Sequence, residues 1–160
     1  MGRPEYVHVV INHFPLEGLL VAVLALAVAL VARERKAILI GVALVGLLAL
    51  SAWPVYYYGQ AGFDRVMSIA DEKGDAFLDQ HKELAERWIA LYFVTAGAAA
   101  LGLALAWKWP KTLELYSLLV LVLAAAALTA GVLIARVGGK IRHREFRSQR
   151  PIPVQSGRYL

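Results

Sequence analysis

The sequence contains no cysteine. This absence excludes disulfide bonds, metal sites built on thiolates, iron–sulfur clusters and the covalent attachment of c-type haem. Any metal or cofactor must therefore be held by imidazole, carboxylate or thioether groups. The cysteine count does not indicate a cellular compartment for this chain.

Several catalytic and transport signatures are also missing. No two histidines lie four residues apart on a predicted helix, as in helix-borne zinc sites, and no serine lies in a nucleophile-elbow context. No predicted membrane span carries a charge at its middle or the kind of Gly/Pro interruption that marks a transporter substrate site. We therefore expect an electron carrier or a subunit of a complex rather than a stand-alone enzyme.

Apolar residues dominate the composition of the chain. They make up 59% of 160 residues, and the mean hydropathy is +0.57, which predicts a single membrane-embedded domain. The formal net charge is +5. Because the basic residues lie mostly at predicted helix ends and in one tail, we expect them to face the lipid bilayer and not nucleic acid.

The hydrophobic runs predict an all-α, integral membrane four-helix bundle. The spans are expected at about 16–32, 37–58, 88–107 and 113–135, within a domain of residues 1–147 followed by a polar tail, 148–160. Pro15 suits the first position of the first span, and residues 6–12 are expected to form a separate short piece. The pair Gly138-Gly139 is expected to end the last helix.

The connection between spans two and three carries two helical patterns. A short amphipathic helix is predicted from the apolar spacing of Phe63, Val66, Met67 and Ala70, with Gly74 as a break after it. A second apolar stripe leads directly into span three and includes a histidine; its members are Phe77, Leu78, His81, Leu84, Ala85 and Trp88. His81 is therefore predicted on the buried side of a helix.

Four spans place both chain ends on one side of the membrane. Counting crossings, all four histidines of the protein, His8, His13, His81 and His143, lie at that same face. One interpretation is that they are interfacial side chains hydrogen-bonded to backbone or lipid. Because an unpaired imidazole on a buried stripe is costly, we favour the other interpretation, which is that they bind a ligand.

The leading hypothesis is a b-type cytochrome that holds haem b near this face and transfers electrons within a membrane redox complex. His13 and His81 are the first predicted ligand pair, and His143 and His8 form a second pair or contact the haem propionates or a quinone. The propionates would also suit the guanidinium groups of Arg142 and Arg144, although these two could equally bind lipid phosphate.

Two alternatives use the same residues differently. The imidazoles of His13, His81, His143 and His8 could hold zinc, copper or iron together with a carboxylate from Glu17, Glu83 or Glu145. The protein could also be a ligand-free accessory subunit whose tail from Phe146 onward binds other subunits of the complex.

Four segments resemble a family of small bacterial four-helix membrane proteins catalogued largely as a domain of unknown function. They are His8-x4-His13-Phe14-Pro15, Tyr58-Gly59-Gln60-Ala61, Asp79-Gln80-His81-Lys82-Glu83 and the run from Gly138 to Glu145. Relatives often carry Thr-Gly-Glu where this chain has Tyr58-Gly59-Gln60, so the carboxylate is replaced here. Some relatives look fused to cytochrome-like domains, so the resemblance implies haem by analogy.

Two groups of basic residues favour opposite orientations of the protein in the membrane. Arg33, Arg35 and Lys36 after the first span favour cytoplasmic short loops, whereas the arginines near the C-terminus favour the reverse. Because the first helix usually dominates, we expect the histidine face on the periplasmic side of a bacterial inner membrane.

Overall fold

The protein is all-α over residues 3–147, which are the residues that the computed structural model describes. The predicted tail, 148–160, lies outside the described residues. Four helical columns, each long and apolar enough to cross a membrane, pack as a bundle, so the predicted four-span architecture is confirmed. Their elements are α1 (Pro4–Ile11), η1 (Phe14–Gly18) and α2 (Leu19–Ala32); α3 (Arg35–Leu50) and α4 (Ala52–Met67); α5 (Glu72–Lys108) and η2 (Pro110–Thr112); and α6 (Leu113–Arg142) and η3 (Arg144–Phe146).

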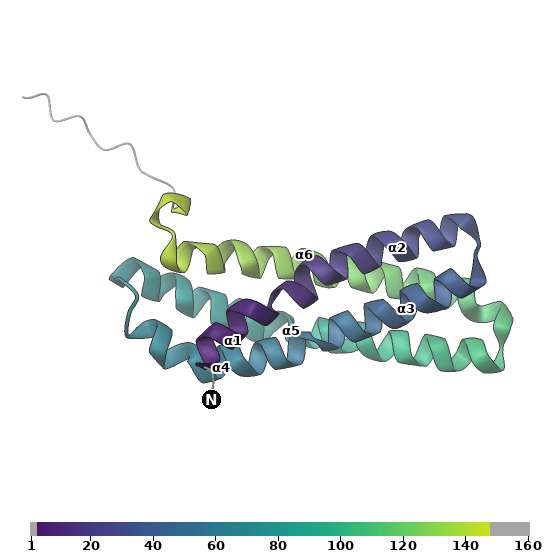
Figure 1. Cartoon of the computed structure of the whole chain (residues 1–160), viewed down its shortest axis with the longest axis horizontal. Helices are drawn as coiled ribbons and strands as arrows, with labels where there is room; N and C mark the ends of the chain where they lie inside the picture. Colours follow the sequence, from purple (N-terminus) through teal and green to yellow (C-terminus); the bar gives the residue numbers. More distant parts are fainter. Residues whose placement is uncertain (1–2, 148–160) are drawn as a thin grey trace, which may run out of the picture.

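The two ends of the bundle differ in what they contain (Figure 1). One end gathers α1, the connection from α4 to α5, and the end of α6, whereas the other holds only the two tight turns α2–α3 and α5–α6. The histidine-bearing elements are all at the first end. At about 1.5 Å per residue, α5 is some 55 Å long and exceeds a hydrocarbon layer of about 30 Å. Its first turns, which carry His81, therefore extend beyond the apolar part of span three.

Small residues allow the columns to pack closely. Ala22, Ala49, Ala99, Ala124 and Ala127 are almost completely buried in the core. A β-carbon on Gly41 would lie 3.1 Å from the α-carbon of Leu26, so α2 and α3 approach at backbone distance. The buried hydroxyls of Thr95 and Ser117 are satisfied within their own helices, because Thr95 donates to Leu91 O and Ser117 donates to Leu113 O.

Much of the outer surface of the bundle is apolar. In the most hydrophobic stretch of each column only 28–33% of residues are buried inside the protein. Val31 and Leu115, for example, are 87% and 71% exposed. Soluble proteins rarely expose apolar side chains over so much of their surface. These side chains face lipid, and the protein is a four-span membrane protein.

The first column bends at a π-helical turn. Pro15 has no amide hydrogen, and its ring would clash with the preceding turn of a regular α-helix. The chain widens there, and Leu19 N donates to Phe14 O, five residues back. Residues 6–12, predicted as a separate piece, thus belong to a helix that is nearly continuous with α2.

The second column bends between Leu50 and Ala52. Pro54 lies in the first turn of α4, and Ser51 Oγ donates to Leu48 O at 2.6 Å. The amphipathic stripe from Phe63 to Met67 forms the second half of α4. The break before α5 falls at residues 68–71, so Gly74 lies inside the first turn of α5.

Candidate functional site

His8 and His81 meet at the histidine-bearing end of the bundle. Their ring centroids are 6.3 Å apart and the ring planes are nearly perpendicular, at 88°. His8 comes from α1 and His81 from α5, and both are half-buried. The structure therefore brings together two of the four predicted histidines, one from each half of the chain.

The His8 ring is held against α4 at a glycine. Its Nδ1 lies 2.8 Å from Val55 O, and a β-carbon on Gly59 would lie only 2.9 Å from that same nitrogen. In an α-helix the side chain of a residue leans over the turn before it, which here contains the Val55 carbonyl. The missing side chain at Gly59 leaves this carbonyl open to the imidazole.

His81 is held in the same way against α6. Its Nδ1 lies 3.0 Å from Ile134 O, and a β-carbon on Gly138 would lie 3.1 Å from Nδ1 and Cε1. Ile134 and Gly138 are four residues apart, as Val55 and Gly59 are. We call each combination of an open carbonyl and a glycine four residues later a carbonyl–glycine cradle.

The cradles determine which nitrogen of each ring carries the proton. A carbonyl oxygen only accepts hydrogen bonds, so the Nδ1 atoms of His8 and His81 must both donate. In the neutral imidazole the Nε2 atom then keeps its lone pair. Both rings thus present a nitrogen able to bind a metal or accept a proton, held by the backbone bond usually found behind metal-ligating histidines.

A cavity of about 120 Å³ lies beside the two rings. Its walls come from α1, η1, α4, α5 and α6, and they are mainly apolar. Polar groups reach it from Asn12, Tyr56 and Tyr92. Tyr92 is 5% exposed, and its hydroxyl packs so closely on Gly131 that any side chain at that position would collide with it.

The other two predicted histidines lie in different surroundings. His13 Nδ1 is 2.9 Å from Glu17 Oε1, one helical turn later, and His143 Nδ1 is 2.9 Å from Glu145 Oε1. Both imidazoles are more than half exposed, at 60% and 58%. Each is thus paired with a nearby glutamate at the surface, and neither lines the cavity.

The predicted arginines are placed by the end of α6. Gly138 and Gly139 do not end this helix, contrary to the sequence prediction, because it continues to Arg142. Arg142 is exposed at the last position of the helix. Arg144 Nε lies 3.0 Å from Asp71 Oδ2, and its side chain is otherwise largely exposed.

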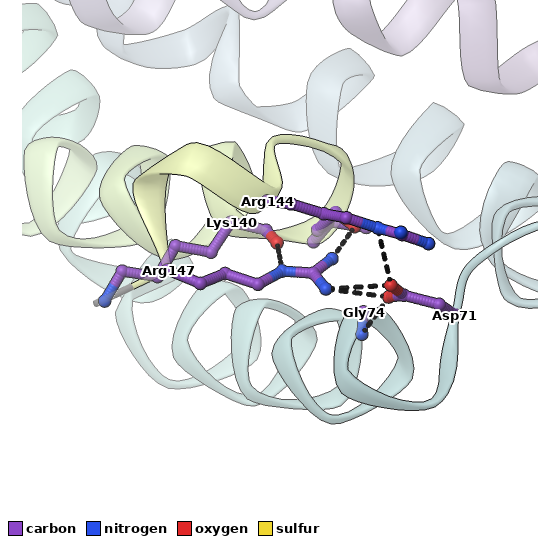
Figure 2. Close-up of polar contacts among 6 residues, drawn as sticks. Asp71, Gly74, Lys140, Arg144 and Arg147 are labelled. Carbon is purple, nitrogen blue, oxygen red and sulfur yellow. Dashed lines mark hydrogen bonds and ion pairs between the residues drawn. The ribbon is translucent and has the colours of Figure 1, made fainter. Parts of the chain in front are cut away.

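Arg147 ties the end of α6 to the beginning of α5 (Figure 2). Its guanidinium donates to both carboxylate oxygens of Asp71, at 2.8 and 3.0 Å, and to Lys140 O and Ile141 O, at 2.7 Å each. These carbonyls belong to the last turn of α6, where no helical amide can reach them. Sequence reasoning missed Arg147, because its partner is 76 residues away.

Asp71 completes this junction as the N-cap of α5. Its Oδ1 accepts from Gly74 N at 2.8 Å, which satisfies a free amide of the first helical turn. The backbone bond from Gly74 and the bond from Arg147 lower the pKa of Asp71 below its ordinary value. Gly74 also admits the end of α6, because a β-carbon there would lie 2.8 Å from Ile141 O.

Within residues 3–147, no group of three or more His, Asp or Glu side chains is arranged to hold a metal ion. The site that the described residues offer is therefore a pair of imidazoles. Sequence reasoning proposed both members but missed the glycines that hold them, although Gly59 and Gly138 lie within the segments that carry the family resemblance.

Comparisons with protein-family models, with curated proteins and with solved structures give no match to this chain. The family resemblance drawn from the four segments thus stays a prediction, and the functional argument rests on the geometry of the site.

Proposed function

We propose that this four-span membrane protein is a b-type cytochrome-like electron carrier in which His8 and His81 bind haem b. The observation that carries the proposal is that two imidazoles from different helices, each with its Nδ1 bonded to a carbonyl, lie beside one cavity. The two ring centroids are 6.3 Å apart, so one bound group could contact both side chains.

The number of protein ligands favours haem over a bare zinc ion. Protein zinc sites take three or four side-chain ligands. A porphyrin supplies four nitrogens itself, so its iron needs at most two from the protein. The candidate site among the described residues offers two imidazole ligands. When bound, haem would supply one-electron transfer, while the cradles would hold the imidazoles in the ligating tautomer.

The cavity sets a condition on this proposal. Pockets for drug-sized ligands usually measure roughly 300–1,000 Å³, so a cavity of about 120 Å³ must widen to take a porphyrin. On the orientation predicted from the first helix, the site would face the periplasm.

A copper ion is the second candidate, and the cavity volume favours it. Imidazole nitrogens suit copper, and a single ion is small beside a cavity of about 120 Å³. Copper would use the same two Nε2 atoms. The two candidates differ in whether a porphyrin is present.

An absorption spectrum of the detergent-purified protein, oxidised and then reduced with dithionite, tests the proposal. Expression with haem available should give a reducible Soret and α band, with about one haem per chain in a pyridine haemochrome assay. Copper at one equivalent without a porphyrin band would replace haem by the second candidate. Folded protein with neither haem nor metal would contradict both.

A further inference from the structure

The end of the bundle away from the histidines carries a second, different pocket. It lies where the turn after α2 meets the turn before α6. Arg35 donates to Pro110 O and Ala106 O, both at 3.4 Å, and so connects the two turns. The pocket has a volume of about 180 Å³.

Basic side chains dominate the polar part of this pocket. It is lined by Arg33, Arg35 and Lys111, with one carboxylate, Glu114, among them. Arg33 is held there by the backbone: its φ of 55° makes it the left-handed residue that ends α2. The beginnings of α3 and α6 flank the pocket, and the positive ends of their helix dipoles add to its attraction for anions.

The position of the pocket indicates the kind of anion. It lies at the end of apolar spans, with Ile38 and Leu113 on its inner wall. Two tryptophans lie at this end of the bundle: Trp107, in the last turn of α5, is 90% exposed, and Trp109, directly after that helix, is 50% exposed. Exposed tryptophan is typical of the headgroup level of a bilayer, and basic pockets between spans bind anionic headgroups there.

We propose that this pocket binds the phosphodiester of an anionic phospholipid, with the guanidinium of Arg33 and the ammonium of Lys111 as its main charged contacts. The lipid tails would lie against the exposed apolar surface of α3 and α6 below. This site is separate from the histidine cavity and does not depend on what that cavity binds.

Native mass spectrometry of the full chain in detergent, with equal amounts of dioleoyl phosphatidylglycerol and dioleoyl phosphatidylcholine, tests the proposal. The wild type should retain phosphatidylglycerol preferentially. Each basic side chain in contact with the headgroup contributes about fivefold to lipid retention, so Arg33→Gln/Lys111→Gln should weaken retention by about 25-fold. Lys36→Gln/Lys108→Gln removes the same charge from the same end but outside the pocket, and should change retention by about twofold at most.

Glu114→Gln provides a test that misfolding cannot imitate, since it should strengthen phosphatidylglycerol retention. Equal retention of both lipids by the wild type would overturn the proposal, as would equal losses in the two double variants. Inorganic phosphate at millimolar concentration should not displace the lipid. Displacement would show a site for free phosphate and would also contradict the proposal.

Discussion

The two pairs of histidines at one end of the bundle have different environments. His8 and His81 are half-buried and bonded to backbone carbonyls of other helices, at Val55 and Ile134. His13 and His143 are exposed, and each is bonded to a glutamate no more than four residues away. Long-range backbone bonds fix a ring in the tertiary structure, whereas a surface pair within one helical turn fixes little.

Position at the membrane face is therefore not what distinguishes a candidate ligand here. All four imidazoles share that face, but only two lie beside the cavity. The difference is made by glycines on the facing helices, Gly59 and Gly138, which let an imidazole reach a carbonyl that another residue would cover. The predictions that follow test whether this difference governs binding.

The largest expected effect comes from filling the cradles. Gly59→Val and Gly138→Val place side-chain carbons where the His8 and His81 rings lie, so either change should reduce cofactor content at least tenfold. The cost in stability should be smaller, about 1–3 kcal/mol, as is usual for added volume in a packed site. Cofactor content and thermal unfolding in detergent measure the two effects.

Gly97→Val is the matched control, because a β-carbon at Gly97 would have no neighbour within 4 Å. It should keep cofactor content and unfolding temperature close to wild type. Equal cofactor loss in this variant and in the cradle variants would contradict a specific role for Gly59 and Gly138.

A smaller effect is expected from the junction between α5 and α6, which supports the helices of the His81 cradle without touching the ring. The folded-state pKa of Asp71 is lowered, so its contribution to stability is present above its unfolded pKa and is lost as pH falls through the folded value. Asp71→Asn keeps an N-cap side chain but removes the charge that Arg144 and Arg147 contact, so it should lower the unfolding temperature by a few degrees at pH 7.

The same variant should lose less stability than the wild type between pH 7 and pH 3, because it has no carboxylate to protonate. Thermal unfolding at the two pH values gives the comparison. The wavelength of any cofactor band should stay unchanged. An identical pH response in both proteins would remove Asp71 from the account.

We expect the smallest effect from substitutions in the two exposed pairs, His13–Glu17 and His143–Glu145. Glu17→Gln and Glu145→Gln each remove the charge from the surface partner of His13 or His143, and exposed pairs of this kind contribute little to stability. Both variants should keep full cofactor content. Loss of cofactor in either one would indicate that an exposed histidine takes part in binding.

The sequence was sufficient to predict the four spans and the shared face of the histidines. Hydrophobic length and the number of crossings determine both. It also placed His81 on the inner side of its helix, where His81 lines the cavity and Leu78 is buried, although Trp88 of the same predicted stripe is exposed. These features depend on local composition and on helical periodicity alone.

The pairing of His8 with His81 depends on something the sequence does not display. It requires the register of α1 on α4 and of α5 on α6, which packing sets over distances of 47 and 53 residues. Glycine commonly follows a helix, so the sequence predicts a helix end at Gly138. In the structure its function is to make room for an imidazole inside the helix. A glycine four residues after an apolar residue is too common a spacing to predict a cradle.

The most direct test compares the reduced-minus-oxidised spectra of four single variants, His8→Ala, His81→Ala, His13→Ala and His143→Ala, purified in parallel with the wild type. The account predicts that the first two lose the low-spin haem bands and that the last two keep them at wild-type intensity. Retained bands in His8→Ala or His81→Ala, or their loss in His13→Ala, would contradict the assignment of the ligand pair.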